Sequence, residues 1–323
     1  MDEIINSAYR RFVNWKKDDE TLVFLYVTDL HSALETSDCL NSQKRETLSH
    51  IKTMNRAAEI FQADFTANLG DCGVEIPVKP QDDVKTLLGR LEEYHSASPV
   101  RPVIYAIGNH DIKQQVTPQY WGNFMLKLNA GCDINTPSGG TYGFFDFHDR
   151  KARVFYLFCN ETKEFYSEEQ LAWFADNLNK TPSGYCAVVV QHICIRQKGR
   201  WRAHAGNPTA PRFVELHNIL ASFVKSGGSL AGVFSGDSHF NLTDAGDGVF
   251  YFSSQGYGGA GPSEAPDHAL RSLEVCPALG RCDSFNSDKT PLIEAVAIKP
   301  ARRETAVFRI GAGDSEFDLT TKF

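Results

Sequence analysis

Five apolar stretches along the chain have the β-branched or aromatic composition that is typical of buried strands. They cover residues 23–28, 65–69, 103–107, 187–191 and 230–235. Helical spacing of apolar residues marks the segments around them, most clearly Ile5, Ala8, Phe12 and Trp15 within residues 3–17. Further helices are predicted near residues 48–61 and 82–95. The first half of the chain therefore predicts a β-α-β-α-β series with parallel strands.

The pattern changes in the second half. Residues 142–147 and 153–158 predict a hairpin joined by His148-Asp149-Arg150. Ser167, followed three residues later by Gln170, predicts a capping box at the start of a helix. A helix over residues 213–224, a strand over 249–253 and a closing hairpin of residues 293–298 and 305–310 complete the series.

These elements predict a single domain over residues 1–323. Its expected class is α/β: a four-layer α/β/β/α sandwich in which two mixed sheets face each other between outer helices. Residues 255–290 are rich in Gly, Pro, Ser and Asp and predict a long loop insertion. A C-terminal hairpin is expected over about residues 292–311.

Net charge, apolar segments and cysteine spacing each argue against particular classes of protein. The 323 residues carry a formal net charge of −7, which argues against a nonspecific nucleic-acid binder with a basic surface. The first residues lack the basic start and apolar run of a signal peptide, and no stretch approaches the roughly 18 apolar residues of a membrane span. The cysteines lack zinc-ribbon spacing, and only Cys276 and Cys282 suggest a bridge. A cytoplasmic protein with reduced thiols is expected.

Metal-binding side chains follow each of the five strands, at the strand ends where open α/β folds place their chemistry. The motifs are Asp29-Leu30-His31, Gly70-Asp71, Gly108-Asn109-His110-Asp111, His192 and Gly236-Asp237-Ser238-His239. Singly, such residues are more often turn caps or structural histidines. That interpretation would have to hold independently at five strand ends, so the series favours a metal centre.

Two divalent cations about 3.5 to 4 Å apart need a bridging carboxylate, and Asp71 at the end of a central strand is the expected bridge. The other expected ligands of the first metal are Asp29, His31 and His239. The other expected ligands of the second metal are Asn109, His192 and Asp237. A hydroxide bridging the metals would be the nucleophile of a hydrolysis reaction.

His110 is the expected general acid, because it directly follows a ligand and can reach a leaving-group or phosphate oxygen. Asp111 is expected to orient the His110 ring and to raise its basicity.

This series of motifs resembles the calcineurin-like metallophosphoesterase superfamily, whose signature is D-x-H, G-D, G-N-H-D/E, a lone H and G-H-x-H. The match spans residues 23–240, and four of the five blocks agree. The resemblance implies hydrolysis of phosphomonoesters or phosphodiesters with two divalent ions such as Mn, Fe, Zn or Mg. The ending at residues 309–314, Arg-Ile-Gly-Ala-Gly-Asp, also resembles the tail of bacterial members found in phage-related sequences.

The chain departs from the signature at Asp237, where the family carries a histidine. A carboxylate in that position would favour Mn²⁺, Mg²⁺ or Fe²⁺ over Zn²⁺, so Mn or Fe is the expected metal. The alternative is a weakened or empty second site.

A basic segment follows His192 and includes Arg196, Arg200, Arg202 and His204. These side chains are candidates for binding a second phosphate or an acidic substrate. The equally weighted alternative is a solvated loop.

The leading hypothesis is therefore a metal-dependent hydrolase of phosphate esters, a phosphodiesterase or phosphomonoesterase whose expected substrate is a phosphodiester or another small organophosphate. No membrane partner is expected, and nucleic acid is a disfavoured partner. The alternatives are a nuclease-like member of the family, or a non-catalytic binding module in which Asp237 marks a degenerate second site.

Overall fold

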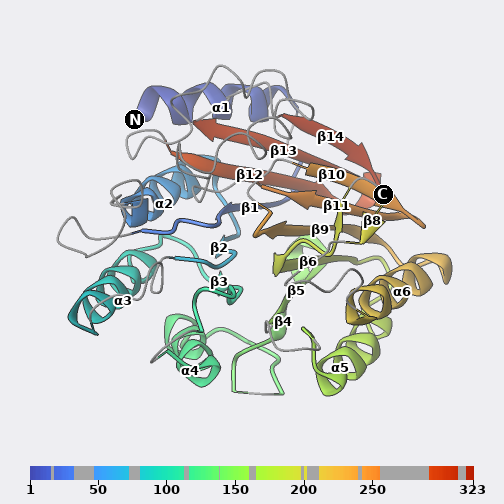
Figure 1. Ribbon diagram of the computed structural model, residues 1–323. Coiled ribbons are helices and arrows are strands. Elements are labelled where there is room, and N and C mark those ends of the chain that lie inside the picture. The colour runs from blue at the N-terminus through green and yellow to red at the C-terminus, as the bar shows by residue number, and fades with distance from the viewer. Residues whose placement is uncertain are drawn as a thin grey trace.

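Two six-stranded mixed sheets pack face to face at the centre of the protein (Figure 1). The computed structural model describes residues 1–15, 18–32, 47–72, 81–112, 116–137, 139–159, 165–197, 200–201, 211–238, 242–254, 291–311 and 318–323. The first sheet has the order β14 (Leu319–Lys322), β13 (Glu304–Gly311), β12 (Leu292–Lys299), β1 (Leu22–Val27), β2 (Phe65–Asn68), β3 (Val103–Tyr105). The second has the order β10 (Leu242–Gly246), β11 (Val249–Ser253), β9 (Leu230–Gly236), β6 (Cys186–Ile193), β5 (Ala152–Leu157), β4 (Gly143–Phe147).

Strand direction follows from the connections. The strands β1, β2 and β3, which are joined through helices, are parallel neighbours, and so are β5, β6, β9 and β11. The hairpins β4–β5, β10–β11 and β12–β13 are antiparallel. Because parallel neighbours end at the same edge of a sheet, the residues that follow them are brought together there.

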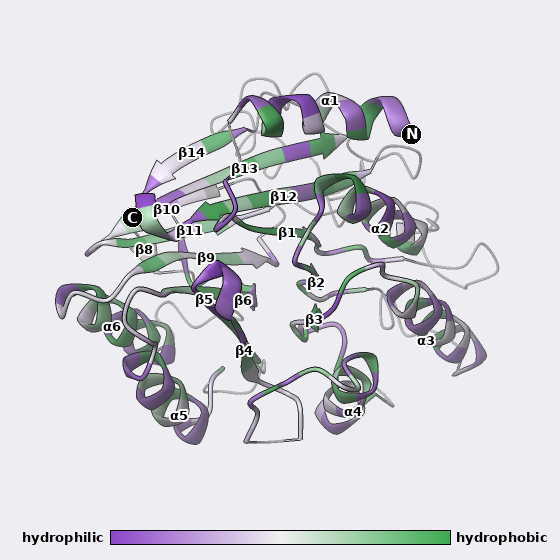
Figure 2. Ribbon diagram, turned by 180° about the vertical axis from the view of Figure 1, so that it is seen from behind, coloured by the Kyte–Doolittle hydropathy of each residue, from purple (hydrophilic) through white to green (hydrophobic). Residues whose placement is uncertain are grey.

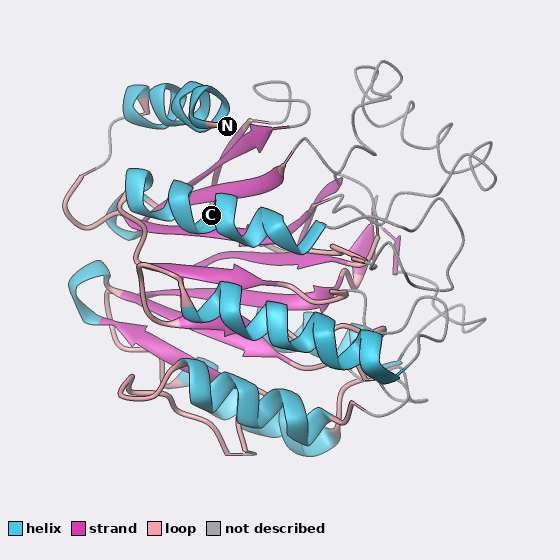
Figure 3. Cartoon of the chain, turned by 90° about the vertical axis from the view of Figure 1, so that its left-hand side faces the viewer, coloured by secondary structure: helices cyan, strands magenta, loops and turns pink. Residues whose placement is uncertain are grey.

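Helices cover the outer faces of both sheets (Figure 1), and Figure 3 shows the helices of one face in front of the strands. The first sheet carries α1 (Asp2–Asn14), α2 (His50–Phe61), α3 (Gln81–Ser96) and α4 (Pro118–Leu128). The second carries α5 (Glu168–Asn179) and α6 (Pro211–Lys225). The predicted four-layer α/β/β/α class is therefore confirmed.

The core between the sheets is aromatic and apolar. Phe234 of β9 lies edge-on to Phe24 of β1, with ring centroids 5.3 Å apart, and all six residues of β1 are buried. Figure 2 shows the matching contrast in hydropathy, with β1 and β12 largely hydrophobic and the helices divided between polar and apolar residues. Burial on both faces explains why these strands have nearly continuous apolar sequences.

Several boundaries differ from the sequence-based expectation. Helix α1 ends at Asn14, and His192 lies inside β6 instead of beyond it. The Ser167 hydroxyl accepts the Gln170 N–H (3.1 Å), but the Gln170 side chain bonds to the backbone of Phe158, so only half of the capping box forms.

Some elements were not predicted. Besides α4, β10 and β14, these are the short strands β7 (Arg196–Gln197) and β8 (Arg200–Trp201) and the 3₁₀ turns Thr47–Ser49, His148–Arg150 and Pro300–Arg302. A signal for α4 was present: Thr117 accepts the Tyr120 N–H as N-cap, and Pro118 takes the first helical position.

The expected closing hairpin corresponds to β12 and β13, whereas the predicted insertion at 255–290, with Cys276 and Cys282, lies outside the described residues. The cysteines in the described part are free thiols. Among the described residues, no helix has the length and apolar character that spanning a membrane requires.

Candidate metal centre

The loops that follow β1 and β2 run side by side because these strands are parallel neighbours. The Asp29 N–H donates to the Gly70 carbonyl and the His31 N–H to the Asp71 carbonyl, each at 2.9 Å. These two bonds continue the strand pairing past the strand ends. They bring the side chains of the first two motifs to one place.

Four of the candidate ligands adopt a left-handed backbone conformation. Their φ angles are +51° at Asp29, +39° at His31, +58° at Asp71 and +59° at Asp237. Non-glycine residues seldom adopt positive φ, and such strain concentrates at functional sites. Four such residues in one constellation indicate that the surrounding structure holds these side chains in place.

Asp71 lies between two groups of potential ligands. Its Oδ2 atom is 3.7 Å from His31 Nε2 and 3.1 Å from His192 Nε2. Asp29, His31 and Asp71 form one group and Asp71, His192 and Asp237 the other, with the ligand atoms of each group within 4.8 Å of one another. The other carboxylate oxygen, Oδ1, accepts the backbone N–H of His110 at 2.9 Å. Only Oδ2 is therefore placed to face both groups.

His192 is oriented as a metal-binding histidine. Its Nδ1 is hydrogen-bonded to the Leu69 carbonyl, which leaves Nε2 facing the group. Asn109 Oδ1 lies 3.0 Å from Nε2, and Asp237 Oδ1 lies 3.7 Å from it. A backbone carbonyl that fixes the second ring nitrogen is the usual support of a metal-ligating histidine.

The backbone of Asp237, a residue of the second group of ligands, is hydrogen-bonded to Asp29 of the first group. Its N–H donates to both carboxylate oxygens of Asp29, at 3.1 and 2.9 Å, and Asp29 Oδ2 also accepts the Thr28 hydroxyl at 2.7 Å. The first and last motifs therefore meet directly, although 208 residues separate them.

Two glycines permit this close approach. A Cβ atom on Gly108 would lie 2.2 Å from Asp71 Oδ1, and one on Gly236 would lie 1.9 Å from the Thr28 hydroxyl oxygen and 2.4 Å from Asp29 Oδ2. A side chain at either position would displace a candidate ligand.

The contacts of Asp111 differ from those expected. Its Oδ1 accepts the Cys72 N–H at 3.0 Å, and its Oδ2 accepts the N–H groups of Asp71 and Gly108 and the Tyr105 hydroxyl, each at 2.9 Å. Asp111 therefore holds the backbone of two loops, and its role in orienting the His110 ring stays a prediction. The donors Asp71 and Cys72 are about 40 residues away in sequence, whereas Gly108 and Tyr105 are close.

His110 lies beside the first group. Its ring is edge-on to that of His31, with centroids 5.2 Å apart. This position places an imidazole next to the candidate ligands.

The carboxylate of Asp71 and the nearby histidines shift one another's pKa values. Burial disfavours the charged form of Asp71, but the nearby His192, His31 and His110 lower the pKa of its carboxyl well below the ordinary value. Burial opposes protonation of His192 as well, yet Asp71 outweighs it and raises the pKa of His192 to about 9. Without a metal, His192 thus carries a proton that a divalent cation would displace on binding.

The donor set suits divalent cations. Two buried carboxylates, those of Asp29 and Asp71, and the partly buried carboxylate of Asp237 converge with two imidazoles and an amide oxygen. Gathering like charges in a buried place is costly unless cations neutralise them. Carboxylate, imidazole and carbonyl groups are the ligands that such cations take in proteins.

The basic segment has a different environment from the one expected for a substrate site. Arg196 Nε lies 3.4 Å from Asp244 Oδ2, and its guanidinium lies over the Trp201 ring. Arg196 therefore packs against the edge strand β10. His239, Arg202 and His204 lie outside the described residues, as does the side chain of Arg200.

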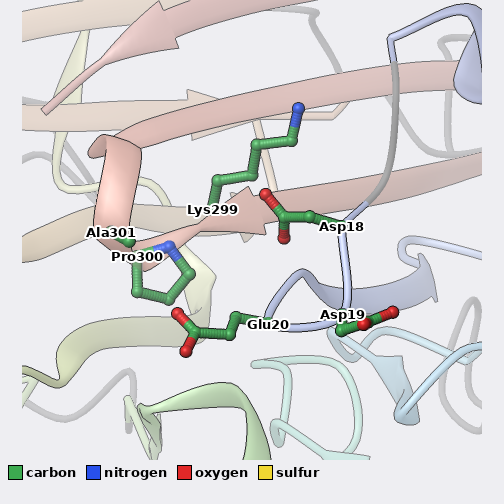
Figure 4. A pocket seen from close by; sticks show the side chains of 6 residues that line it. All are labelled: Asp18, Asp19, Glu20, Lys299, Pro300 and Ala301. Carbon is green, nitrogen blue, oxygen red and sulfur yellow. The ribbon is translucent and has the colours of Figure 1, made fainter.

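A shallow pocket elsewhere contains none of these residues (Figure 4). It is lined by Asp18, Asp19 and Glu20, which precede β1, and by Lys299, Pro300 and Ala301, which follow from the end of β12. The pocket is therefore at the other end of β1 from the motif residues, and Lys299 there donates to the Trp15 carbonyl at 3.0 Å.

The fold is shared with solved structures. A dimetal phosphatase from Danio rerio matches with a TM-score of 0.60 at 12% identity, over 94% of this chain and 99% of that one. GAP50, described as the anchor in the inner membrane complex of Plasmodium, matches with a TM-score of 0.53 at 12% identity, over 94% and 88%. No family model and no curated protein matches the sequence. Since one relative is described as a phosphatase and the other as an anchor, the shared fold leaves activity to be argued from the site.

Proposed function

We propose that this chain, which has the calcineurin-like metallophosphoesterase fold, hydrolyses phosphate esters at a centre of two divalent cations. The observation that carries the proposal is Asp71 Oδ2, which lies between the group of Asp29 and His31 and the group of His192 and Asp237. A shared carboxylate between two sets of ligands is what a dinuclear hydrolytic site requires.

Each residue has a role in this proposal. Asp29 and His31 would hold the first cation, for which His239 is a further proposed ligand. Asn109, His192 and Asp237 would hold the second, and the Asp71 carboxylate would serve both. When bound, the two cations supply Lewis-acid polarisation of the phosphoryl oxygens and activation of a water.

His110 would donate a proton to the leaving-group oxygen. Its ring lies next to His31, so an ester bound at the first group comes within reach of it. Asp111 supports this step indirectly, because it fixes the backbone N–H groups on both sides of the centre.

The proposed substrate class is a small phosphodiester. Asp237 adds one negative charge to the centre compared with a histidine at that position. A dianionic monoester is repelled by that charge more than a monoanionic diester is, because Coulomb energy scales with the product of the charges. The cytoplasmic location and Mn or Fe as the metal remain proposals that rest on sequence and donor chemistry.

The test is hydrolysis of bis(p-nitrophenyl) phosphate and p-nitrophenyl phosphate by the purified full chain reconstituted with Mn²⁺. We expect faster turnover of the diester. Because metal-based stabilisation is worth several kcal/mol, Asp71→Asn should lower kcat/KM by about 100-fold or more. Asp176→Asn, which removes an exposed carboxylate on α5, is the matched control and should leave the rate unchanged.

Unchanged activity in Asp71→Asn would contradict the proposal, as would a protein that holds two Mn²⁺ ions and hydrolyses neither ester. Asp237→His separates a working ligand from a decayed site. A working ligand predicts that the variant keeps two metals with a shifted preference, whereas decay predicts that metal binding and activity appear only in the variant.

A further inference from the structure

Three polar residues occupy directly paired positions on neighbouring strands of the first sheet. Tyr26 on β1 pairs with Glu294 on β12, and Glu294 pairs with Arg309 on β13. All three side chains are almost completely buried. Glu294 and Arg309 form an ion pair, in which Arg309 Nε donates to Glu294 Oε1 at 2.8 Å.

A buried ion pair of this kind calls for an explanation other than stability. Removing two charges from water is expensive, and well-packed apolar residues of similar size usually stabilise a core at least as well. The pair also makes a contact beyond itself: Glu294 Oε1 accepts the hydroxyl of Ser254 at 2.9 Å. Ser254 directly follows β11, a strand of the other sheet.

Ser254 and its neighbour Ser253 hold the loop of the last motif. The Ser254 N–H donates to the Ser235 carbonyl at 3.0 Å, which continues the pairing of β11 with β9. The Ser253 hydroxyl bonds to the Gly236 carbonyl at 3.0 Å and to the Ser238 hydroxyl at 2.6 Å. Asp237 is therefore held on both flanks from β11.

We propose that Glu294 and Arg309 are positioning residues for the second metal site, acting through Ser254 on the loop that carries Asp237. The first sheet thereby sets the place of a ligand that the second sheet supplies. The metal part of this inference rests on the proposed function, whereas the positioning of the loop does not.

The test compares Ser254→Ala with Ser254→Thr in the full chain. In metal-free protein, amide hydrogen exchange at Asp237, whose N–H binds Asp29, reports the order of the loop. Loss of one hydrogen bond of ordinary strength should raise that exchange rate about five- to tenfold in Ser254→Ala. Ser254→Thr keeps a hydroxyl and should exchange at the wild-type rate. The Cys72 amide, which binds Asp111 on the other side of the centre, should keep its rate.

A second variant removes the ion pair without leaving a lone buried charge. Glu294→Leu combined with Arg309→Met should raise Asp237 exchange as Ser254→Ala does. In a Mn²⁺ titration, Ser254→Ala and the double variant should each bind at least one of the two ions about five- to tenfold less tightly than the wild type, since one lost hydrogen bond sets the scale. Ser226→Ala, which deletes a remote hydroxyl bonded to the Phe223 carbonyl, is the control and should match the wild type.

Wild-type exchange at Asp237 in both variants would overturn the inference. Equal acceleration at Asp237 and Cys72 would overturn it too, because it would reveal general loosening. Failure of the wild-type protein to bind a pair of Mn²⁺ ions would instead count against the proposed function, and the exchange data would still decide the positioning of the loop.

Discussion

At the scale of single residues, the centre depends on places where the backbone of one loop lies against the side chain of another. Gly108 is the sharpest case, since the nearest atom to an added Cβ would be Asp71 Oδ1, the oxygen that accepts the His110 N–H. The role of this glycine is steric and is specific to the neighbouring aspartate.

Gly108→Ala should therefore displace Asp71 and impair both groups of ligands. We expect a loss of about 2 to 4 kcal/mol in unfolding free energy, because overpacking of this severity exceeds the usual cost, and loss of tight binding of two Mn²⁺ ions. The matched control is Gly89→Ala in α3, where a Cβ meets nothing within 4 Å. That change should stabilise the protein by about 0.5 to 1 kcal/mol. Urea unfolding of both variants checks the pair, and similar effects would contradict the steric explanation.

At the scale of elements, the loops after β2 and β3 are joined through one buried carboxylate. Asp111 accepts N–H groups from both loops and a hydroxyl from Tyr105 on β3. Burial, followed by the nearby negative charge of Asp71, raises the pKa of the Asp111 carboxyl. Its environment therefore resists charge, and the hydrogen bonds offset part of that cost.

Replacing the Asp111 carboxylate should lower the unfolding free energy more than removing one of its hydrogen-bond donors does. Asp111→Asn should lower the unfolding free energy of metal-free protein by about 2 to 3 kcal/mol, because the amide nitrogen accepts no hydrogen bond and would leave buried donors unpaired. Tyr105→Phe deletes one donor and should cost about 1 kcal/mol. Equal losses in denaturant unfolding would show that the carboxylate does no more than pair with Tyr105.

At the scale of the whole molecule, a buried histidine links stability to pH. His95 at the end of α3 is completely buried, packs edge-on against Tyr105 and Phe124, and bonds to the Asn68 side chain. Burial, assisted by the positive charge of Arg101, lowers the pKa of His95 to about 3. Since its unfolded value is near 6.5, the unfolded chain takes up a proton that the folded protein excludes.

The stabilising contribution of a neutral His95 is complete above about pH 6.5 and is lost as the pH falls toward 3. In that window the group should reduce the unfolding free energy by about 1.4 kcal/mol per pH unit. His95→Gln should flatten the pH dependence measured by urea unfolding of metal-free protein. His148→Gln at the surface is the control for loss of one histidine, and equal flattening there would contradict the assignment to His95.

Sequence by itself determined the class of fold and the place of the motifs. The strands and helices were predictable because their signals are local: β-branched runs for strands buried on both faces, and helical spacing for the helices. That Asp29 and Asp71 would meet also followed, because parallel neighbouring strands end at one edge of a sheet. Asp237 follows β9 of the other sheet, so its approach to Asp29 depends on how the two sheets pack. The predictions were weaker for short edge elements such as β10 and β14, whose few residues carry little periodic signal.

Only the tertiary structure decided how side chains from distant segments share their contacts. Asp111 serves the backbone of the loop after β2, Arg196 turns to Asp244, and Glu294 reaches Ser254 across the two sheets. None of these partners is near its residue in sequence, and each residue had other chemically suitable partners. A hydrogen bond or ion pair depends on distances of a few ångströms between atoms, and those distances exist only after the layers have packed.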